Sequence, residues 1–147
     1  MLKDKLTQDV KNALKAGDKQ RRLVLGMVIA AAKNKEIEKR SELSDEEIIA
    51  GISFEIKKRK DAVEQYGKGG RPELAEQEKH EINILMEYLP EQMPEDEIRT
   101  EAKKTISDTG AQGIKEMGKV LGALMPKLKS RADGQTVSRI VKEELAK

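Results

Sequence analysis

Apolar residues recur at every third or fourth position through almost the whole chain, and they nowhere alternate with polar residues. Leu2, Leu6, Val10 and Leu14 set the pattern at a spacing of four. This spacing puts apolar side chains on one face of an α-helix, whereas a half-buried strand requires strict alternation. The pattern therefore predicts an all-α protein.

The residues available for a core also favour helix. The chain has one Phe, two Tyr and no Trp, so its core must be built from Leu, Ile, Val, Ala and Met. These residues, with abundant Glu and Lys, are good helix formers. Charged residues make up 38% of the chain, against about 25% in a typical globular domain. The helices should therefore be amphipathic rather than fully buried.

Residues typical of helix ends divide the first part of the chain into four predicted helices. Gly17 should end the first helix, and Asp18 should cap the second. Ser44 and Glu47 have the form of a capping box for the third helix, and Pro72 suits the first turn of the fourth. The second helix is apolar on more than one face, which predicts that it is the central helix of its bundle.

The two prolines of YLPEQMPEDE, residues 88–97, mark the predicted domain boundary. We expect an N-terminal four-helix bundle over 1–92 and a C-terminal three-helix domain over 93–147. The three helices of the second domain are predicted at about 94–108, 113–129 and 133–146. Pro126 should kink the middle helix, because its ring clashes with the carbonyl of Gly122.

Several classes of function are disfavoured by composition. The chain has no cysteine, which excludes disulfides, thiolate metal sites and a cysteine nucleophile. No apolar run approaches the roughly 18 residues that a membrane span needs. The N-terminal segment MLKDKLTQDVK is charged and unlike a signal peptide. We expect a soluble cytoplasmic protein that does not interact with membranes.

No local arrangement of residues predicts catalysis, a metal site or a cofactor. His80 is the only histidine and lies between carboxylates without an HExxH pattern, so a solvated or capping role is expected. The glycine-rich segment 66–72 lacks the spacing of a phosphate-binding loop and is expected to be a turn between helices. The charged runs 33–40 and 57–60 are expected to be solvated helix faces.

One segment concentrates positive charge. Residues 112–131, QGIKEMGKVLGALMPKLKSR, hold five basic residues and one acid, whereas the whole chain has a net charge of +2. Because rings for base stacking are scarce, a nucleic acid would be held through phosphate contact and shape. The rival interpretation is plain solvated charge, with Gly118 and Gly122 serving close helix packing. The candidate RNA-binding residues are Lys115, Lys119, Lys127, Lys129 and Arg131, with Gly118 and Gly122 permitting close approach.

Several blocks of sequence resemble the bacterial YqeY family in the same order along nearly the full chain. They are MGKVLGALMPKLKSRADGQTVSRIVKEEL at 117–145, together with segments at 21–40, 57–78 and 88–92. The C-terminal block also resembles, more weakly, the tail domain of GatB, the B subunit of the glutamyl/aspartyl-tRNA amidotransferase. The matching residues are Gly118, Val120, Lys129-Ser130-Arg131, Ala132 and Val137.

This resemblance implies a four-helix domain followed by a three-helix tail-like domain. In the amidotransferase the tail contacts the outer corner of tRNA, and other domains perform the chemistry. The chain departs from the tail pattern at Asp133-Gly134, which replaces Asn-Pro, and in a middle helix expected to be about one turn longer. The implied function is binding of tRNA or a tRNA-handling complex. The alternatives are an adaptor of an amidotransferase or aminoacyl-tRNA synthetase and, implied only by the family label, a glutamine-dependent carbon–nitrogen ligase. The oligomeric state stays open.

Overall fold

The computed structural model describes all 147 residues and is all-helical, with seven α-helices, one short 3₁₀ turn and no strand. The predicted fold class is therefore confirmed. The chain forms two compact units, Met1–Leu89 and Pro90–Lys147, called unit 1 and unit 2 below. The predicted division into domains 1–92 and 93–147 stays a prediction.

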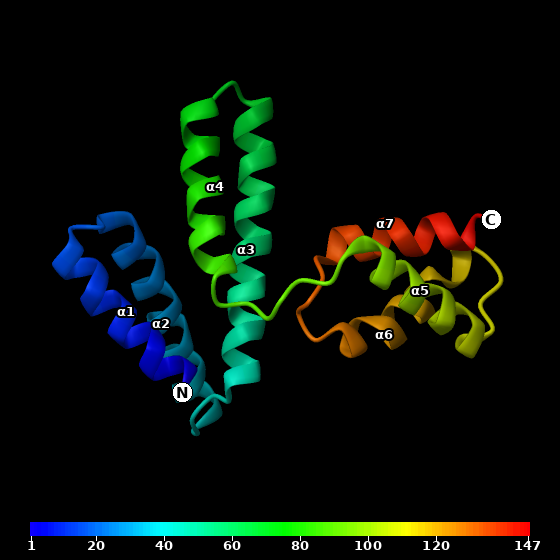
Figure 1. Ribbon diagram of the computed structural model, residues 1–147, viewed down its shortest axis with the longest axis horizontal. Helices are drawn as coiled ribbons and strands as arrows, with labels where there is room; N and C mark the ends of the chain where they lie inside the picture. The colour runs from blue at the N-terminus through cyan, green and yellow to red at the C-terminus, as the bar shows by residue number, and fades with distance from the viewer. The chain divides into compact units, whose positions relative to one another are not determined.

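Unit 1 contains four helices that pack mainly as two antiparallel pairs (Figure 1). The local signals in the sequence work as expected: Gly17 adopts a left-handed φ of 72°, and Asp18 accepts a hydrogen bond from the backbone N–H of Arg21. The capping box of Ser44 and Glu47 is also present. The helices are α1 (Leu2–Ala16), α2 (Lys19–Lys39), α3 (Asp45–Lys68) and α4 (Pro72–Met86).

The core of unit 1 is purely aliphatic apart from Tyr88. Its most deeply buried members are Leu6, Leu25, Ile52, Ile84 and Leu85. Helices α2 and α3 each contact the other three helices, so these contacts do not single out α2 as the central helix. The second apolar face of α2 is not covered.

On that second face the side chains of Leu23 and Met27 are 51% and 52% exposed. From the apolar character of α2 on more than one face, the sequence suggested that the helix is buried at the centre of its bundle. In the structure the second apolar face is exposed instead. The core uses only one face of the helix, because the buried side chains of α2 all lie within about 100° of one another around its axis.

The turn between α3 and α4 joins two helices, as predicted for residues 66–72, and Gly70 supplies its left-handed φ of 70°. The expectation that the run 57–60 is solvated is wrong for Arg59, which is only 7% exposed. Its Nε donates to the carboxylate of Glu81 on α4 at 3.1 Å, and its Nη1 donates to the carbonyl of Glu55 at 3.1 Å. A buried guanidinium needs such partners, and α4 supplies one of them.

Unit 2 contains α5 (Glu95–Thr109), a 3₁₀ turn (Ile114–Glu116), α6 (Met117–Leu128) and α7 (Gly134–Leu145). Its core is built from all three helices, with Ala102, Val120, Leu124, Val137 and Ile140 fully buried. Helix α6 starts later than predicted, because residues 114–116 form the tighter turn. Pro126 lies inside α6, which continues for only two further residues.

Candidate nucleic-acid interface

The five predicted cations occupy one continuous segment made of the 3₁₀ turn, α6 and the loop that follows. Lys119 and Lys127 lie on α6, Lys129 is its C-cap residue, and Arg131 lies in the loop. Lys115 lies in the 3₁₀ turn and not in the predicted helix 113–129, so α-helical spacing does not relate it to Lys119.

Helix α6 buries one face and exposes the other. The buried side chains recur at a spacing of four, which places them together against α5 and α7; they are Val120, Leu124 and Leu128. Gly118, Gly122 and Pro126 follow the same spacing on the opposite, exposed side. A Cβ built on either glycine meets nothing within 4 Å. The two glycines therefore do not serve close helix packing within this chain, and they leave bare backbone on the surface.

The exposed lysines lie beside this strip of bare backbone. Lys119 and Lys127 are separated by about 12 Å along the helix axis, since each residue rises about 1.5 Å. Neither they nor Lys115 and Lys129 form an ion pair with a carboxylate. Their positive charge is therefore available to an anion from outside the chain.

The loop after α6 holds an unusual backbone conformation. Lys129 and Ser130 both have left-handed φ values, 46° and 64°, although neither is glycine. Each such residue costs about 1 kcal/mol, so neighbouring contacts must hold the loop in place. The side-chain amide of Gln92 provides one contact by donating to the carbonyl of Ser130 at 3.1 Å.

Arg131 provides two further contacts that hold this loop in place. Its Nε donates to the carbonyl of Glu91 at 3.0 Å, and its own carbonyl accepts from the N–H of Met93 at 2.7 Å. Arg131 is half-buried and thus anchors the segment before α5, a role that the sequence did not suggest. The single acid of the segment, Glu116, accepts from the backbone N–H of Gln112 at 2.5 Å and does not neutralise the lysines.

The other two helices of unit 2 present a different charge. Helix α5 carries three basic and five acidic residues, a net charge of −2, and α7 carries two of each. Arg99 of α5 binds Glu143 and Glu144 of α7 at 2.7 Å each. Hydrogen bonding to Arg99 lowers the pKa of both carboxyls below the usual value. The arginine on α5 is thus used to join helices, whereas the four lysines of the 112–131 segment have no carboxylate partner.

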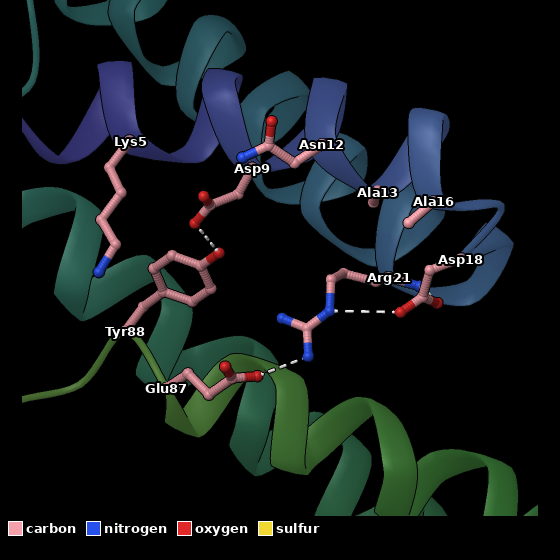
Figure 2. A pocket seen from close by; sticks show the side chains of 9 residues that line it. All are labelled: Lys5, Asp9, Asn12, Ala13, Ala16, Asp18, Arg21, Glu87 and Tyr88. Atoms are coloured by element: carbon pink, nitrogen blue, oxygen red, sulfur yellow. Dashed lines mark hydrogen bonds and ion pairs between the residues drawn. The ribbon is translucent and has the colours of Figure 1, made fainter.

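Unit 1 contains a polar cavity of about 370 Å³ between α1, α2 and the end of α4 (Figure 2). The Tyr88 hydroxyl donates to Asp9 at 2.5 Å, and burial together with this bond raises the pKa of Tyr88. Arg21 binds both Asp18 and Glu87 (Figure 2). Asp9 and Tyr88 are 79 positions apart in sequence, so no local sequence pattern predicted this network. Because these charges satisfy one another, the network is explained by its role in joining three helices.

Two further features bear on chemistry. His80 is exposed on α4, and no three residues of the ligand types His, Cys, Asp and Glu come together as a metal site would require. None of the helices has both the length and the apolar character needed to cross a membrane.

Comparison with known proteins places the chain in a family. The family described as Yqey-like protein matches residues 3–145. A Vanderwaltozyma polyspora protein named "Altered inheritance of mitochondria protein 41, mitochondrial" is 34% identical over 107 residues, which is 70% of this chain and 57% of the relative.

Proteins of the same name in two other fungi are also similar. The Kluyveromyces lactis protein is 36% identical over 84 residues, covering 56% of this chain and 45% of the relative. The Pyrenophora tritici-repentis protein is 26% identical over 142 residues, covering 95% and 78%. The chain spans about half the length of the first of these relatives. Their names place them in mitochondria, and the cytoplasmic location expected for this chain stays a prediction. From its match along nearly its whole length, the chain belongs to the YqeY family.

Proposed function

We propose that this protein binds tRNA through the basic segment of unit 2. The observation that carries the proposal is the group of exposed lysines without ion pairs, Lys119, Lys127 and Lys129, beside the bare backbone of Gly118 and Gly122. Phosphate groups form the most favourable contacts with exposed lysines, and an exposed backbone without Cβ atoms lets a sugar-phosphate chain approach closely.

The alternative of plain solvated charge explains less. Solvated lysines are usually interspersed with acids at helical spacing, whereas 112–131 has one acid and that acid is used in a turn. The resemblance of this segment to the GatB tail points to the same ligand class. Arg131 contributes mainly by holding the loop that carries Lys129.

The test is fluorescence anisotropy with unfractionated tRNA over a range of salt concentrations. Three lysine contacts predict that the logarithm of affinity falls with a slope of about −3 against the logarithm of salt concentration. The variant reverses Lys119, Lys127 and Lys129 to Glu. The matched control reverses Lys103, Lys104 and Lys142 to Glu, which changes the charge of unit 2 by the same amount on exposed positions of α5 and α7.

Loss of binding in the α6 variant with retention in the control supports the proposal. Equal loss in both variants would mean that only net charge matters and would refute the assignment to α6. A slope near zero would refute phosphate contact altogether. Circular dichroism of both variants checks that the helices persist, as expected for substitutions at exposed positions.

One observation favours a second candidate, a protein adaptor. An apolar groove of about 240 Å³ lies between α2 and α3 of unit 1, next to Phe54, which is 60% exposed. A purified amidotransferase or synthetase that binds the chain after nuclease treatment, and that loses binding in Phe54→Asp, would support this function. Binding that disappears on nuclease treatment would support the tRNA proposal. Glutamine-dependent amide transfer, the weakest candidate, requires that highly purified protein release glutamate from glutamine in the presence of an acceptor.

A further inference from the structure

Helix α2 carries an apolar stripe that the fold leaves uncovered. The side chains of Leu23, Met27 and Ile37 are 51%, 52% and 74% exposed. The residues that α2 buries in the core, Val24, Leu25, Val28 and Ala32, lie on the other side of the helix. Exposed apolar residues that form a continuous row indicate a contact with another surface, whereas single ones do not.

The spacing of the row indicates what kind of surface this is. Its members follow one another at intervals of four, three, four and three, and are Leu23, Met27, Ala30, Asn34 and Ile37. An average period of 3.5 keeps the row in register with a second helix that runs alongside and supercoils with it. In heptad terms Met27 and Asn34 take the a positions, and Leu23, Ala30 and Ile37 take the d positions.

Asn34 indicates the identity and direction of the partner helix. It is exposed and its side chain forms no hydrogen bond within the chain. In a parallel, in-register pair of identical helices, Asn34 meets its own copy, and a single asparagine pair at an a position specifies two strands in register. In an antiparallel pair a positions meet d positions, so Asn34 would face an apolar residue and lose its solvation without compensation.

The charges that flank the stripe agree with the parallel arrangement. Lys33 takes the g position and Glu38 the e position of the next heptad, the two positions that pair across a parallel dimer. Neither forms an ion pair within the chain. They cannot pair with each other on one helix, since residues five apart lie about 140° apart around its axis. Two helices in register would form this ion pair twice.

We propose that the exposed stripe of α2 is the contact between two copies of this protein, with the two α2 helices parallel and in register. The stripe extends over about 21 Å of helix. An interface of two heptads lies at the small end of specific interfaces, so the dimer is weak, with a dissociation constant on the order of tens of micromolar. The contact lies in unit 1 and does not depend on whether unit 2 binds RNA.

The direction of the two helices is tested with a single cysteine. Because the chain has no cysteine, Ile37→Cys introduces one thiol, which in the parallel dimer lies opposite its own copy. In an antiparallel pair centred on the stripe, at Ala30, the two thiols would stand about 21 Å apart along the axis. Mild oxidation should give a disulfide-linked dimer of Ile37→Cys and none of the control Lys11→Cys, which is exposed on α1. Equal or absent crosslinking in the two variants would overturn the parallel arrangement.

The ion pairs are tested by sedimentation equilibrium without RNA, from about 10 to about 500 µM protein. Lys33→Glu and Glu38→Lys should each weaken dimerisation about fivefold, and the double variant should restore it. Rescue by the double variant supports the contact, because the two residues cannot pair within one helix. A wild-type chain that stays monomeric throughout this range, or a double variant as weak as the single ones, would overturn the proposal.

Discussion

Two basic stretches that look alike in the sequence have different roles in the structure. In the run 57–60, Arg59 points into unit 1, is 7% exposed and binds Glu81 of the neighbouring helix. In the segment 112–131, Lys119 and Lys127 are exposed and have no carboxylate partner. The number of cations in a stretch therefore does not indicate whether they stabilise the fold or remain available to a ligand.

The difference arises from the helices packed against each stretch. Helix α3 lies along α4, which places a carboxylate within reach of Arg59. Helix α6 packs on α5 and α7 through apolar side chains such as Val120 and Leu124, and the acids of α7 are already bound to Arg99. The lysines of α6 are thus left facing solvent.

The largest effect is expected from removing the buried cation. Arg59→Ala leaves the Glu81 carboxylate, which is 13% exposed, without its partner, and should lower the free energy of unfolding by about 3–4 kcal/mol. Lys57→Ala on the same run is exposed and should change it by less than about 0.5 kcal/mol. Urea unfolding followed by circular dichroism measures both. Equal effects would show that the buried Arg59 contributes no more to stability than an exposed cation of the same run.

A somewhat smaller effect, on binding rather than stability, is expected from neutralising the α6 lysines. Replacing Lys119, Lys127 and Lys129 by Ala should weaken tRNA binding roughly 100-fold at about 0.1 M salt, or about 2.7 kcal/mol. The unfolding free energy should stay unchanged, because none of the three forms an ion pair. The measurements are anisotropy and urea unfolding. A variant that unfolds more easily but still binds would show that these lysines act as Arg59 does.

Alanine substitutions at the two glycines of α6 should have opposite effects on the stability of unit 2 and on its binding of tRNA. Gly118→Ala and Gly122→Ala place a methyl group in open space on a helix surface and should each stabilise unit 2 by about 0.7 kcal/mol. If the sugar-phosphate chain approaches the bare backbone here, the same substitutions weaken tRNA binding. Thermal unfolding and anisotropy on the same samples measure the two effects. Tighter binding by the alanine variants would exclude close approach at these positions.

The smallest effect is expected from pH, through the ion pairs that join α5 to α7. The pKa values of Glu143 and Glu144 are lowered in the folded state by Arg99. A lowered folded pKa means that the stabilisation is complete above the ordinary carboxyl pKa of 4.5 and is lost as the pH falls through the folded value. Arg99→Gln lacks this stabilisation, so its Tm should lie below that of the wild type at neutral pH and approach it on acidification. A constant difference in Tm down to pH about 2 would contradict this origin.

Much of the fold was predictable because it depends on local interactions. The four-residue spacing of Leu2 and Leu6, the capping box of Ser44 and Glu47, and the stop at Gly17 act within a few residues of one another. The candidate site was partly predictable for the same reason, since its lysines are close in sequence. The position of Lys115 was not, because a 3₁₀ turn replaces the expected start of α6.

The amino-acid sequence by itself determined that this protein is helical, where most of its helices begin and end, and where its positive charge is concentrated. Only the tertiary structure decided that Arg59 is buried, that Arg131 clamps the segment before α5, and that α2 leaves Leu23 and Met27 exposed. Helix formation follows from side chains within about four residues of each other. Burial and ion pairing follow from which helix lies alongside, and the partners of Arg59 and Arg131 are 22 and 40 residues away in the chain.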